Sequence, residues 1–367
     1  MATSSQASAA PVSGLPIEKS ARYHFDIYAI LEAPQELYFG SEVAVNINLV
    51  ETVKVMLPGD TNDDTTIEKC YISPTKRRGV ERRMLIWAPR ADGTLLGDFL
   101  GCGIPGTCCR PDCPICSVYG GLITDRNEKS VYLRDSTPHK EDLKPTTYMG
   151  RLTHGGGVAV QAQEVSTKQR AMHPSRMHKE EEDNPMPFRR EYNQPALLYP
   201  VYNHCLSITD AQFEAIAYAF LNVLPRIGAG NPKGVRVADG DILGTSQPLL
   251  VVDRYRVPLG ARPVISPAII APNAAISSFV AQAVKVRSEA QQWSVIGVDQ
   301  NGQVEEIKKP QPTDNTPSDS AASADQGGNA KRVDVFTRWI GAEAMQKLEE
   351  CALSFTKNVL LNPLDGV

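Results

Sequence analysis

The sequence predicts an α+β protein built around an antiparallel or mixed sheet. Residues 21–33, ARYHFDIYAILEA, have an apolar side chain at every second position, which is the period of a strand. The alternating residues are Tyr23, Phe25, Ile27, Ala29 and Leu31. Residues 207–228 instead carry apolar side chains at spacings of three and four, the period of a helix. Because few helices interleave with the strands and long polar segments interrupt them, a regular parallel α/β fold is disfavoured.

The composition is that of a soluble globular protein. The chain has 367 residues, of which 42% are hydrophobic, and its net charge is −4. It contains no run of about 20 apolar residues that would span a bilayer, and its first residues do not resemble a signal peptide. We therefore expect a cytoplasmic protein without a membrane partner. The net charge hides a local basic cluster, because Lys76–Arg90 holds six Lys or Arg residues and one acid, Glu81.

The N-terminal half is expected to alternate strands with irregular segments. Residues 1–20 are rich in Ala, Ser and Pro and are predicted to be disordered. Strands are expected at 42–57 and 130–135, with a polar loop at about 58–75 after the first of them. The segment 166–195 is rich in charge, His, Met and Pro, which indicates an insertion or an exposed loop.

The C-terminal half holds the clearest helix. Thr209 or Asp210 can cap its N-terminus, and Pro225 and Gly228 end it. A further helix is expected at 274–293, and residues 299–331 have the composition of a disordered linker. Residues 332–367 are predicted to be a helical segment that packs on the main domain, which spans 21–298.

Five of the eight cysteines lie within residues 102–116. A reducing compartment and a C-x2-C pair favour a tetrahedral zinc site over disulfides. The favoured ligands are Cys102, Cys108, Cys113 and Cys116, and Cys109 competes with Cys108 for the second position. A thiol oxidoreductase would need only the C-x2-C pair. A closed four-cysteine site has no open position for catalysis, so the zinc is expected to be structural.

Other motifs are weaker. Asp60, Asp63 and Asp64 could bind a divalent metal, although such residues are also typical of solvated turns. The HGGG sequence that starts at His154 lacks the G-x-S-x-G partner of a hydrolase. The glycine-rich residues 228–234 match no nucleotide-binding pattern. Both glycine segments could still let backbone N–H groups approach a phosphate.

Four segments, taken in order, resemble the superfamily of repeat-associated RNA-binding subunits of CRISPR effector complexes. The segments are EAPQELYFGS (32–41), YISPTKRRGVERRML (71–85), CPICSVYGG (113–121) and RIGAGNPKGVRV (226–237). The cysteine cluster, the GRLTHGGGVAVQAQEV segment (150–165) and the chain length narrow the resemblance to the backbone subunit of type I-D complexes, the Cas-seven family. The arginine-rich RRGVERR and the absence of an aromatic residue from NPKGV depart from the pattern.

The resemblance implies an RRM-like (ferredoxin-like) palm with inserted finger, zinc-binding (about 98–121) and thumb elements. Its implied partners are a guide CRISPR RNA, the target DNA paired with it, neighbouring copies of the chain, and the large and guide-end-capping subunits. The implied RNA-binding residues are Lys76, Arg77, Arg78, Arg82, Arg83, His154, Gly155, Gly156, Gly230, Lys233 and Arg236. The implied thumb or target-facing residues are Arg170, Met172, His173 and Arg176.

The expected function is therefore a non-catalytic subunit that polymerises along a guide RNA in antiviral defence. The alternative is the same architecture with metal-dependent cleavage of the target strand by the loop aspartates. A zinc-stabilised thiol oxidoreductase, or an unrelated structural protein, is a third hypothesis.

Overall fold

The structure is a computed structural model. It describes residues 21–38, 42–44, 47–56, 66–104, 106–110, 112–123, 146–162, 166–169, 189–228, 234–256, 264–289, 295–298, 304–307, 331–332 and 336–361. The predicted 130–135 strand lies outside them. Within these ranges no helix has the length and apolarity needed to cross a membrane.

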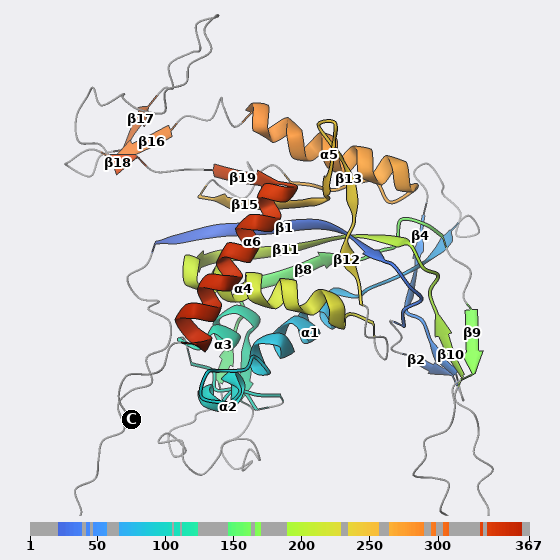
Figure 1. Cartoon of the computed structure of the whole chain (residues 1–367), viewed down its shortest axis with the longest axis horizontal. Helices are drawn as coiled ribbons and strands as arrows, with labels where there is room; N and C mark the ends of the chain where they lie inside the picture. The colour runs from blue at the N-terminus through green and yellow to red at the C-terminus, as the bar shows by residue number, and fades with distance from the viewer. Residues whose placement is uncertain are drawn as a thin grey trace, which may run out of the picture.

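A central antiparallel sheet organises the chain (Figure 1). Its strands, in spatial order, are β19 (Phe336–Ile340), β15 (Leu250–Tyr255), β1 (Arg22–Ala33), β11 (Leu197–Thr209) and β8 (Leu152–Gly156), and the short β12 (Arg236–Val237) also pairs with β1. Every pairing among them is antiparallel. The sheet and the helices around it confirm the predicted α+β class.

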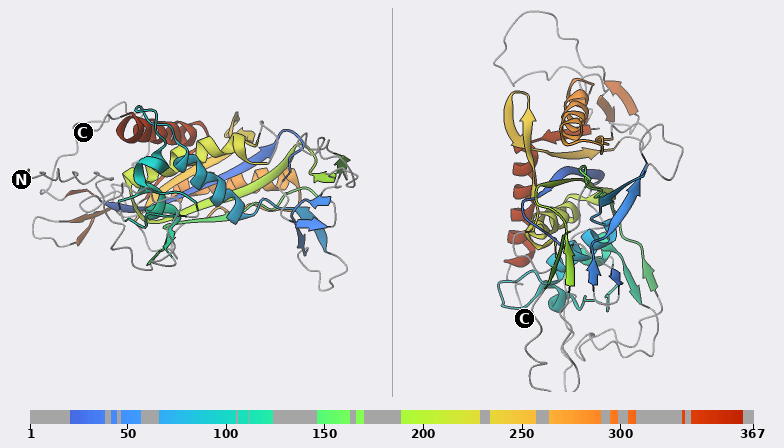
Figure 2. Two further views of the ribbon diagram at one scale, coloured as in Figure 1. Left: turned by 90° about the horizontal axis from the view of Figure 1, so that it is seen from below. Right: turned by 90° about the vertical axis from the view of Figure 1, so that its right-hand side faces the viewer.

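Helices cover both faces of the sheet (Figures 1 and 2). One face carries α1 (Pro74–Ile86), α3 (Pro114–Tyr119), α4 (Asp210–Val223) and α6 (Ala342–Phe355), whose buried residues share one core. The short α2 (Leu96–Leu100) belongs to the same core. The other face carries α5 (Pro272–Glu289), which packs in a second core.

The alternation of β1 explains the two cores. Phe25, Ile27, Ala29 and Leu31 point to the face covered by α4 and α6, as the period of two predicts. The intervening Tyr28 and Ile30 point to the face covered by α5. Both faces are therefore buried along most of the strand, and β1 lies in the centre of the sheet, hydrogen-bonded to β11 and β15.

The helix predicted at 207–228 begins as expected. The Thr209 hydroxyl accepts a hydrogen bond from the Gln212 backbone at 3.2 Å, and the Gln212 side chain accepts one from the Thr209 backbone at 3.0 Å. This capping box satisfies two backbone N–H groups at the helix N-terminus. The helix then seats the Phe213 ring on the Phe25 ring, 4.1 Å between centroids. A 3-10 turn, Leu224–Arg226, ends it at Pro225.

The remaining strands form small separate sheets. They are β2 (Glu42–Ala44), β3 (Ile47–Leu49), β4 (Thr52–Val55), β5 (Ile67–Cys70), β6 (Gly121–Ile123), β7 (Thr146–Tyr148), β9 (Ser166–Gln169), β10 (Arg189–Tyr192), β13 (Asp239–Ile242), β14 (Thr245–Pro248), β16 (Val295–Val298), β17 (Val304–Ile307) and β18 (Lys331–Arg332).

Three sequence-based expectations differ from these elements. The single strand expected at 42–57 is three short strands, because β2 and β3 form a hairpin and β4 pairs instead with β5. The segment 299–331 contains β17, which pairs with β16. The C-terminal helical segment begins with a strand, β19, because Phe336–Ile340 pairs with β15 before α6 starts. A π-helical turn, Thr356–Leu360, follows α6.

Candidate metal centre and nucleic-acid interface

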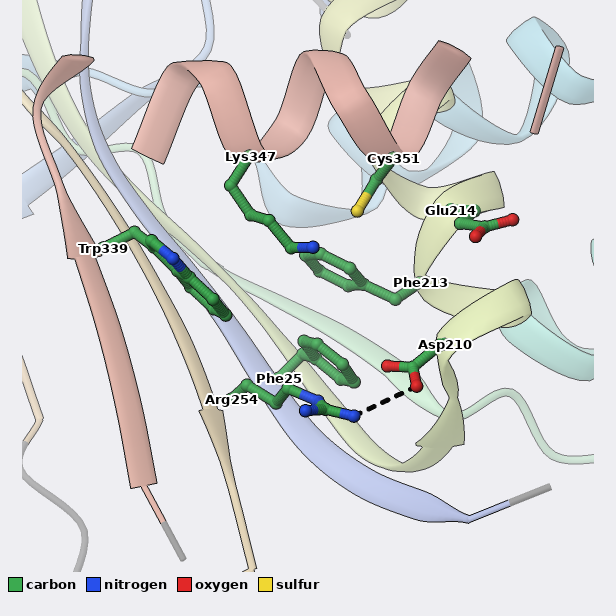
Figure 3. A pocket seen from close by; sticks show the side chains of 8 residues that line it. All are labelled: Phe25, Asp210, Phe213, Glu214, Arg254, Trp339, Lys347 and Cys351. Atoms are coloured by element: carbon green, nitrogen blue, oxygen red, sulfur yellow. Dashed lines mark hydrogen bonds and ion pairs between the residues drawn. The ribbon is translucent and has the colours of Figure 1, made fainter. Parts of the chain in front are cut away.

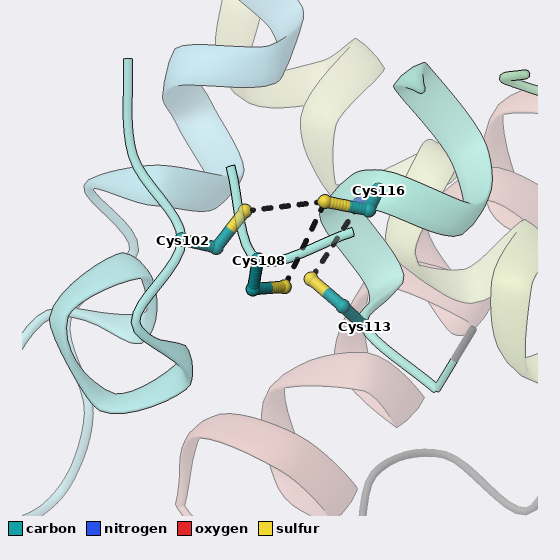
Figure 4. Close-up of side chains that lie close together, drawn as sticks. All are labelled: Cys102, Cys108, Cys113 and Cys116. Carbon is teal, nitrogen blue, oxygen red and sulfur yellow. Dashed lines mark hydrogen bonds between the residues drawn. The ribbon is translucent and has the colours of Figure 1, made fainter. Parts of the chain in front are cut away.

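Four cysteine side chains converge beside α3 (Figure 4). Their sulfur atoms all lie within 4.8 Å of one another, and the residues are Cys102, Cys108, Cys113 and Cys116. The Cys116 sulfur is 3.4 Å from that of Cys102 and 3.7 Å from that of Cys108. All four are free thiols rather than disulfides. The cluster therefore contains the four residues that the spacing favours.

The sulfur geometry fits a tetrahedral metal ion. With zinc–sulfur bonds of about 2.3 Å, the sulfurs of a tetrahedral site are about 3.8 Å apart, close to the two distances above. Hydrogen bonding, first from Cys108, lowers the pKa of the Cys102 thiol, whereas burial raises the pKa of Cys113. Thiols in mutual contact cannot all ionise without a cation between them. The cluster can hold a metal ion.

The structure also decides between Cys108 and Cys109. The Cys109 sulfur lies 3.2 Å from the Thr107 hydroxyl rather than in the cluster, and its backbone has a positive φ of 48°. That left-handed conformation turns two adjacent cysteines in different directions. Cys108 is therefore the fourth member of the cluster.

The loop that carries the four cysteines is continuous with the main core. Cys113 caps the N-terminus of α3, where its sulfur accepts a hydrogen bond from the Cys116 backbone at 3.5 Å. The next residues of α3, Ile115 and Val118, are fully buried in the core that α1 and α4 share. A metal ion at this site would hold α3 against the other helices of that face.

The inner face of α1 carries a buried polar network. Glu81 is 1% exposed and lies 2.7 Å from the imidazole Nε2 of His154 on β8. Asn203 on β11 donates to the same carboxylate at 3.2 Å, and Tyr119 on α3 donates to it at 3.3 Å. Burial tends to raise the pKa of Glu81, but His154, Arg77 and Asn203 outweigh it, and the pKa is lowered. Glu81 is thus a buried carboxylate that joins three elements to α1.

Arg77 belongs to the same inner face. Its guanidinium donates to the backbone carbonyl of Gly155 at 2.7 Å and to that of Tyr202 at 3.2 Å, and the residue is 1% exposed. Burial lowers the pKa of Arg77 to about 10, which leaves it charged at neutral pH. Because buried charges need several partners, these contacts give Arg77 a structural position between α1 and the edge of the sheet.

Three of the residues expected to touch RNA are therefore buried. Arg77, His154 and Gly155 come together, but they do so beneath α1, where they contact one another and Glu81. The sequence does not show this burial, because Glu81 and His154 are 73 residues apart and are brought into contact only by the fold. Gly156, the next residue of β8, is exposed and has a positive φ of 72°.

The outer face of α1 is partly exposed and basic, in contrast to its buried inner face. Lys76, Gly79 and Arg83 lie at helical spacings of three and four, so they share one face. A Cβ at Gly79 would meet no heavy atom of the described chain within 4 Å. Lys76 is ion-paired with Glu51 at 2.6 Å, but both side chains are partly exposed, and such pairs contribute only about 0–1 kcal/mol. This face, which we call the basic face of α1, presents two cations beside accessible backbone.

The other two arginines of α1 turn towards the cysteine loop. Arg78 donates to the backbone carbonyl of Tyr119, at the end of α3. Arg82 acts electrostatically on Cys109, and two of its buried nitrogens have no hydrogen-bond acceptor among the described residues. Both side chains are half-buried. They place positive charge next to the cluster of thiols.

The last described candidate, Arg236, lies on β12. Its guanidinium is 63% exposed and pairs with Glu32 of β1 at 2.9 Å. The other candidates, Gly230 and Lys233, the four thumb residues Arg170, Met172, His173 and Arg176, and the aspartates Asp60, Asp63 and Asp64 lie outside the described residues. Their roles stay predictions.

Sequence reasoning missed two groups of residues. Asn203 and Tyr119 have no recognisable motif, and only the fold brings them to Glu81. Trp339 and Lys347 lie in the C-terminal segment, where amphipathicity indicated packing rather than a cavity. The available signal in the sequence was a tryptophan followed by a lysine within the same predicted segment.

Comparisons with known proteins give distant structural likenesses. No family profile matches the sequence, and no curated protein matches it. The crystal structure of Thermofilum pendens Csc2 aligns with a TM-score of 0.38 and 14% identity over 73% of this chain and 76% of that one. A Type IV-B CRISPR complex gives 0.35 and 12% over 66% and 95%, and a CRISPR RNA-guided surveillance complex gives 0.38 and 12% over 72% and 84%. Because their TM-scores are below 0.5, these likenesses carry no argument about function. Any proposal about function has to rest on the geometry of this chain.

Proposed function

We propose that the chain is a guide-RNA-binding backbone subunit of a CRISPR effector complex, of the Cas-seven family in its type I-D form. In this proposal the subunit polymerises along the guide RNA, holds it for pairing with target DNA, and contacts the large and guide-end-capping subunits. It binds and positions nucleic acid and catalyses no reaction. Its place of action is the cytoplasm.

The topology of the sheet supports an RRM-like palm. The strands β1, β8, β11 and β15 occur in this order along the chain, with α1 between the first two and α4 between the last two. In space their order is β15, β1, β11, β8, and both helices pack on the same face. A β-α-β-β-α-β chain arranged in this way is ferredoxin-like.

The basic face of α1 is the observation that carries the proposal. Lys76 and Arg83 flank the open backbone at Gly79, so a phosphate can approach closely between two cations. None of these residues reads a base, which suits a subunit that must accept guides of any sequence. The buried Arg77–Glu81 side of the same helix fixes it to the sheet and thereby fixes the position of the basic face.

The four cysteines are proposed to bind a structural zinc ion. Four thiolates around one Zn²⁺ leave a local charge of −2, and Arg78 and Arg82 lie on the adjacent helix, where they compensate it. Zinc would hold α3, and through Tyr119 the Glu81 network, in place behind the basic face.

The test is RNA binding by the purified chain. We expect it to copurify with RNA, to bind single-stranded RNA without sequence preference, and to lose affinity steeply with salt. The double variant Lys76→Ala/Arg83→Ala should lower the slope of log K against log salt by about 1.4, which is two phosphate contacts on a single strand. Lys357→Ala, an exposed lysine after α6, is the matched control. Failure of the wild-type protein to bind RNA at low salt would refute the proposal.

A further inference from the structure

A cavity opens on the face of the sheet that α4 and α6 cover, and none of the four clustered cysteines lines it. It has a volume of about 190 Å³ and lies between α4, α6, β15 and β19 (Figure 3). Its lining residues are Phe25, Asp210, Phe213, Glu214, Arg254, Trp339, Lys347 and Cys351. An engineered apolar cavity of about 150 Å³ takes up benzene, so this volume suits one flat ring system.

Aromatic rings form the floor and one wall of the cavity. Phe25 and Phe213 are each 1% exposed and stack with an angle of 12° between their planes. Trp339 projects from the edge strand β19 and is only partly buried, so its ring forms the wall (Figure 3). A flat ligand entering here would leave water and contact an indole face at the same time.

Two positively charged side chains, Lys347 and Arg254, also line this cavity. The Lys347 side chain projects from α6 into the cavity, with its ammonium 5.5 Å from the centre of the Trp339 ring (Figure 3). It forms no ion pair within 4 Å among the described residues, although it lies near enough to Glu214 and Cys351 to favour their ionised forms. Arg254 pairs with Asp210 at 3.0 Å and lies 3.5 Å from the centre of the Tyr23 ring. The exposed Arg256 does not line the cavity, but it lies 4.0 Å from the same Tyr23 ring, next to Arg254.

Hydrogen-bond acceptors complete the lining. Asp210 and Glu214 come from the first turns of α4, and burial raises the pKa of Glu214. Carboxylates accept hydrogen bonds from the exocyclic amino groups of nucleobases. Aromatic walls, neighbouring cations and such acceptors are the combination that holds an unpaired base and its flanking phosphates.

We propose that this cavity binds one unpaired base of a single-stranded RNA, stacked on Trp339. The phosphates on either side of the base contact Lys347 and Arg256. The site lies on other elements than the basic face of α1 and adds a base-binding function to the phosphate contacts assigned there. It rests on the proposed function only in taking RNA as the partner.

The experiment uses the full chain and an oligouridine that carries a single 2-aminopurine. Stacking on an indole quenches the fluorescence of this base, and anisotropy of a labelled copy reports affinity. The variants are Trp339→Leu and Lys347→Ala. Their matched controls are Trp87→Leu, an exposed tryptophan at the end of α1, and Lys357→Ala. Thermal melts establish that each variant is folded.

We expect Trp339→Leu to abolish the quenching and to weaken binding about tenfold, the effect of losing one base stack. Lys347→Ala should lower the salt slope by about 0.7, and both controls should behave as wild type. If wild-type protein binds RNA and both cavity variants match it, the cavity proposal is overturned while the proposed function stands. If the cavity variants lose self-association instead of RNA affinity, the cavity is a protein contact and the proposal is equally overturned. Wild-type protein that binds no RNA overturns both.

Discussion

Gly79 offers a test in which stability and binding should move in opposite directions. It is the sixth residue of α1, and a Cβ placed there meets no described atom within 4 Å. Alanine in a helix interior is about 0.8–1.0 kcal/mol more favourable than glycine. With no steric cost to subtract, Gly79→Ala should raise the free energy of unfolding by about 0.8 kcal/mol and Tm by about 2 °C.

The same methyl group should weaken RNA binding. If a phosphate lies against the backbone at Gly79, the Cβ pushes it away from Lys76 and Arg83 and lowers the affinity about fivefold, which corresponds to about 1 kcal/mol. Urea unfolding followed by circular dichroism measures the first effect, and anisotropy with single-stranded RNA measures the second. The control is Thr75→Ala, which improves helix propensity at an exposed position of α1 without touching the glycine.

Two results would refute the reasoning. A loss of stability in Gly79→Ala would mean that the space beside the helix is filled. A gain in stability with unchanged RNA affinity would show that no phosphate approaches at this residue, and the basic face of α1 would lose its role.

Three further predictions concern the metal centre and the buried network. Cys113→Ser should abolish binding of the proposed zinc ion and lower Tm, whereas Cys109→Ser should leave zinc binding intact. Elemental analysis after gel filtration that finds equal zinc in both variants would contradict the site. Arg77→Met should lower the free energy of unfolding by about 3 kcal/mol, because the carbonyls of Gly155 and Tyr202 lose a charged donor, and urea melts measure this. Because Glu81 still holds α1 through His154 and Asn203, the folded variant should bind RNA normally, and a selective loss of binding would return Arg77 to the interface. Because the pKa of Glu81 is lowered in the folded state, its charge contributes stability above its ordinary pKa of 4.5, and this stability is lost as the pH falls through the folded value. Glu81→Gln should therefore be less stable at pH 7 and lose less stability on acidification. If the free energies of unfolding of the two proteins, measured with urea from pH 7 to about pH 2, fell in parallel, this assignment would be wrong.

Local patterns predicted the local structure well. The alternation in β1, the cap and stripe of α4 and the spacing of four cysteines are each encoded within a short window of sequence. The strand expected at 42–57 was wrong because periodicity does not say which strand pairs with which, and there β4 turns to β5. The start of the C-terminal segment was likewise interpreted as helix, because a local pattern does not reveal that it pairs with β15, about 80 residues earlier in the chain.

The same limit applies to the candidate site, where local patterns were readable from the sequence and tertiary contacts were not. Sequence reasoning identified the basic segment that forms α1, but it could not separate the two faces of that helix. Lys76 and Arg83 lie on its outer face, while Arg77 lies between them in sequence and points into the core. Glu81 is the single acid of α1 and marks its inner face, because its hydrogen bonds to His154 and Asn203 hold that side of the helix against the sheet.

The central position of β1 has a consequence for synthesis of the protein. This strand leaves the ribosome early, yet its neighbours are β11, which starts at Leu197, and β15, which starts at Leu250. At roughly 5–20 residues per second, β1 waits on the order of 10 s for its first partner. During that time its unpaired backbone edges and its apolar faces are open to other nascent chains. The central strand of this sheet therefore cannot find its main partner until most of β11 has been translated.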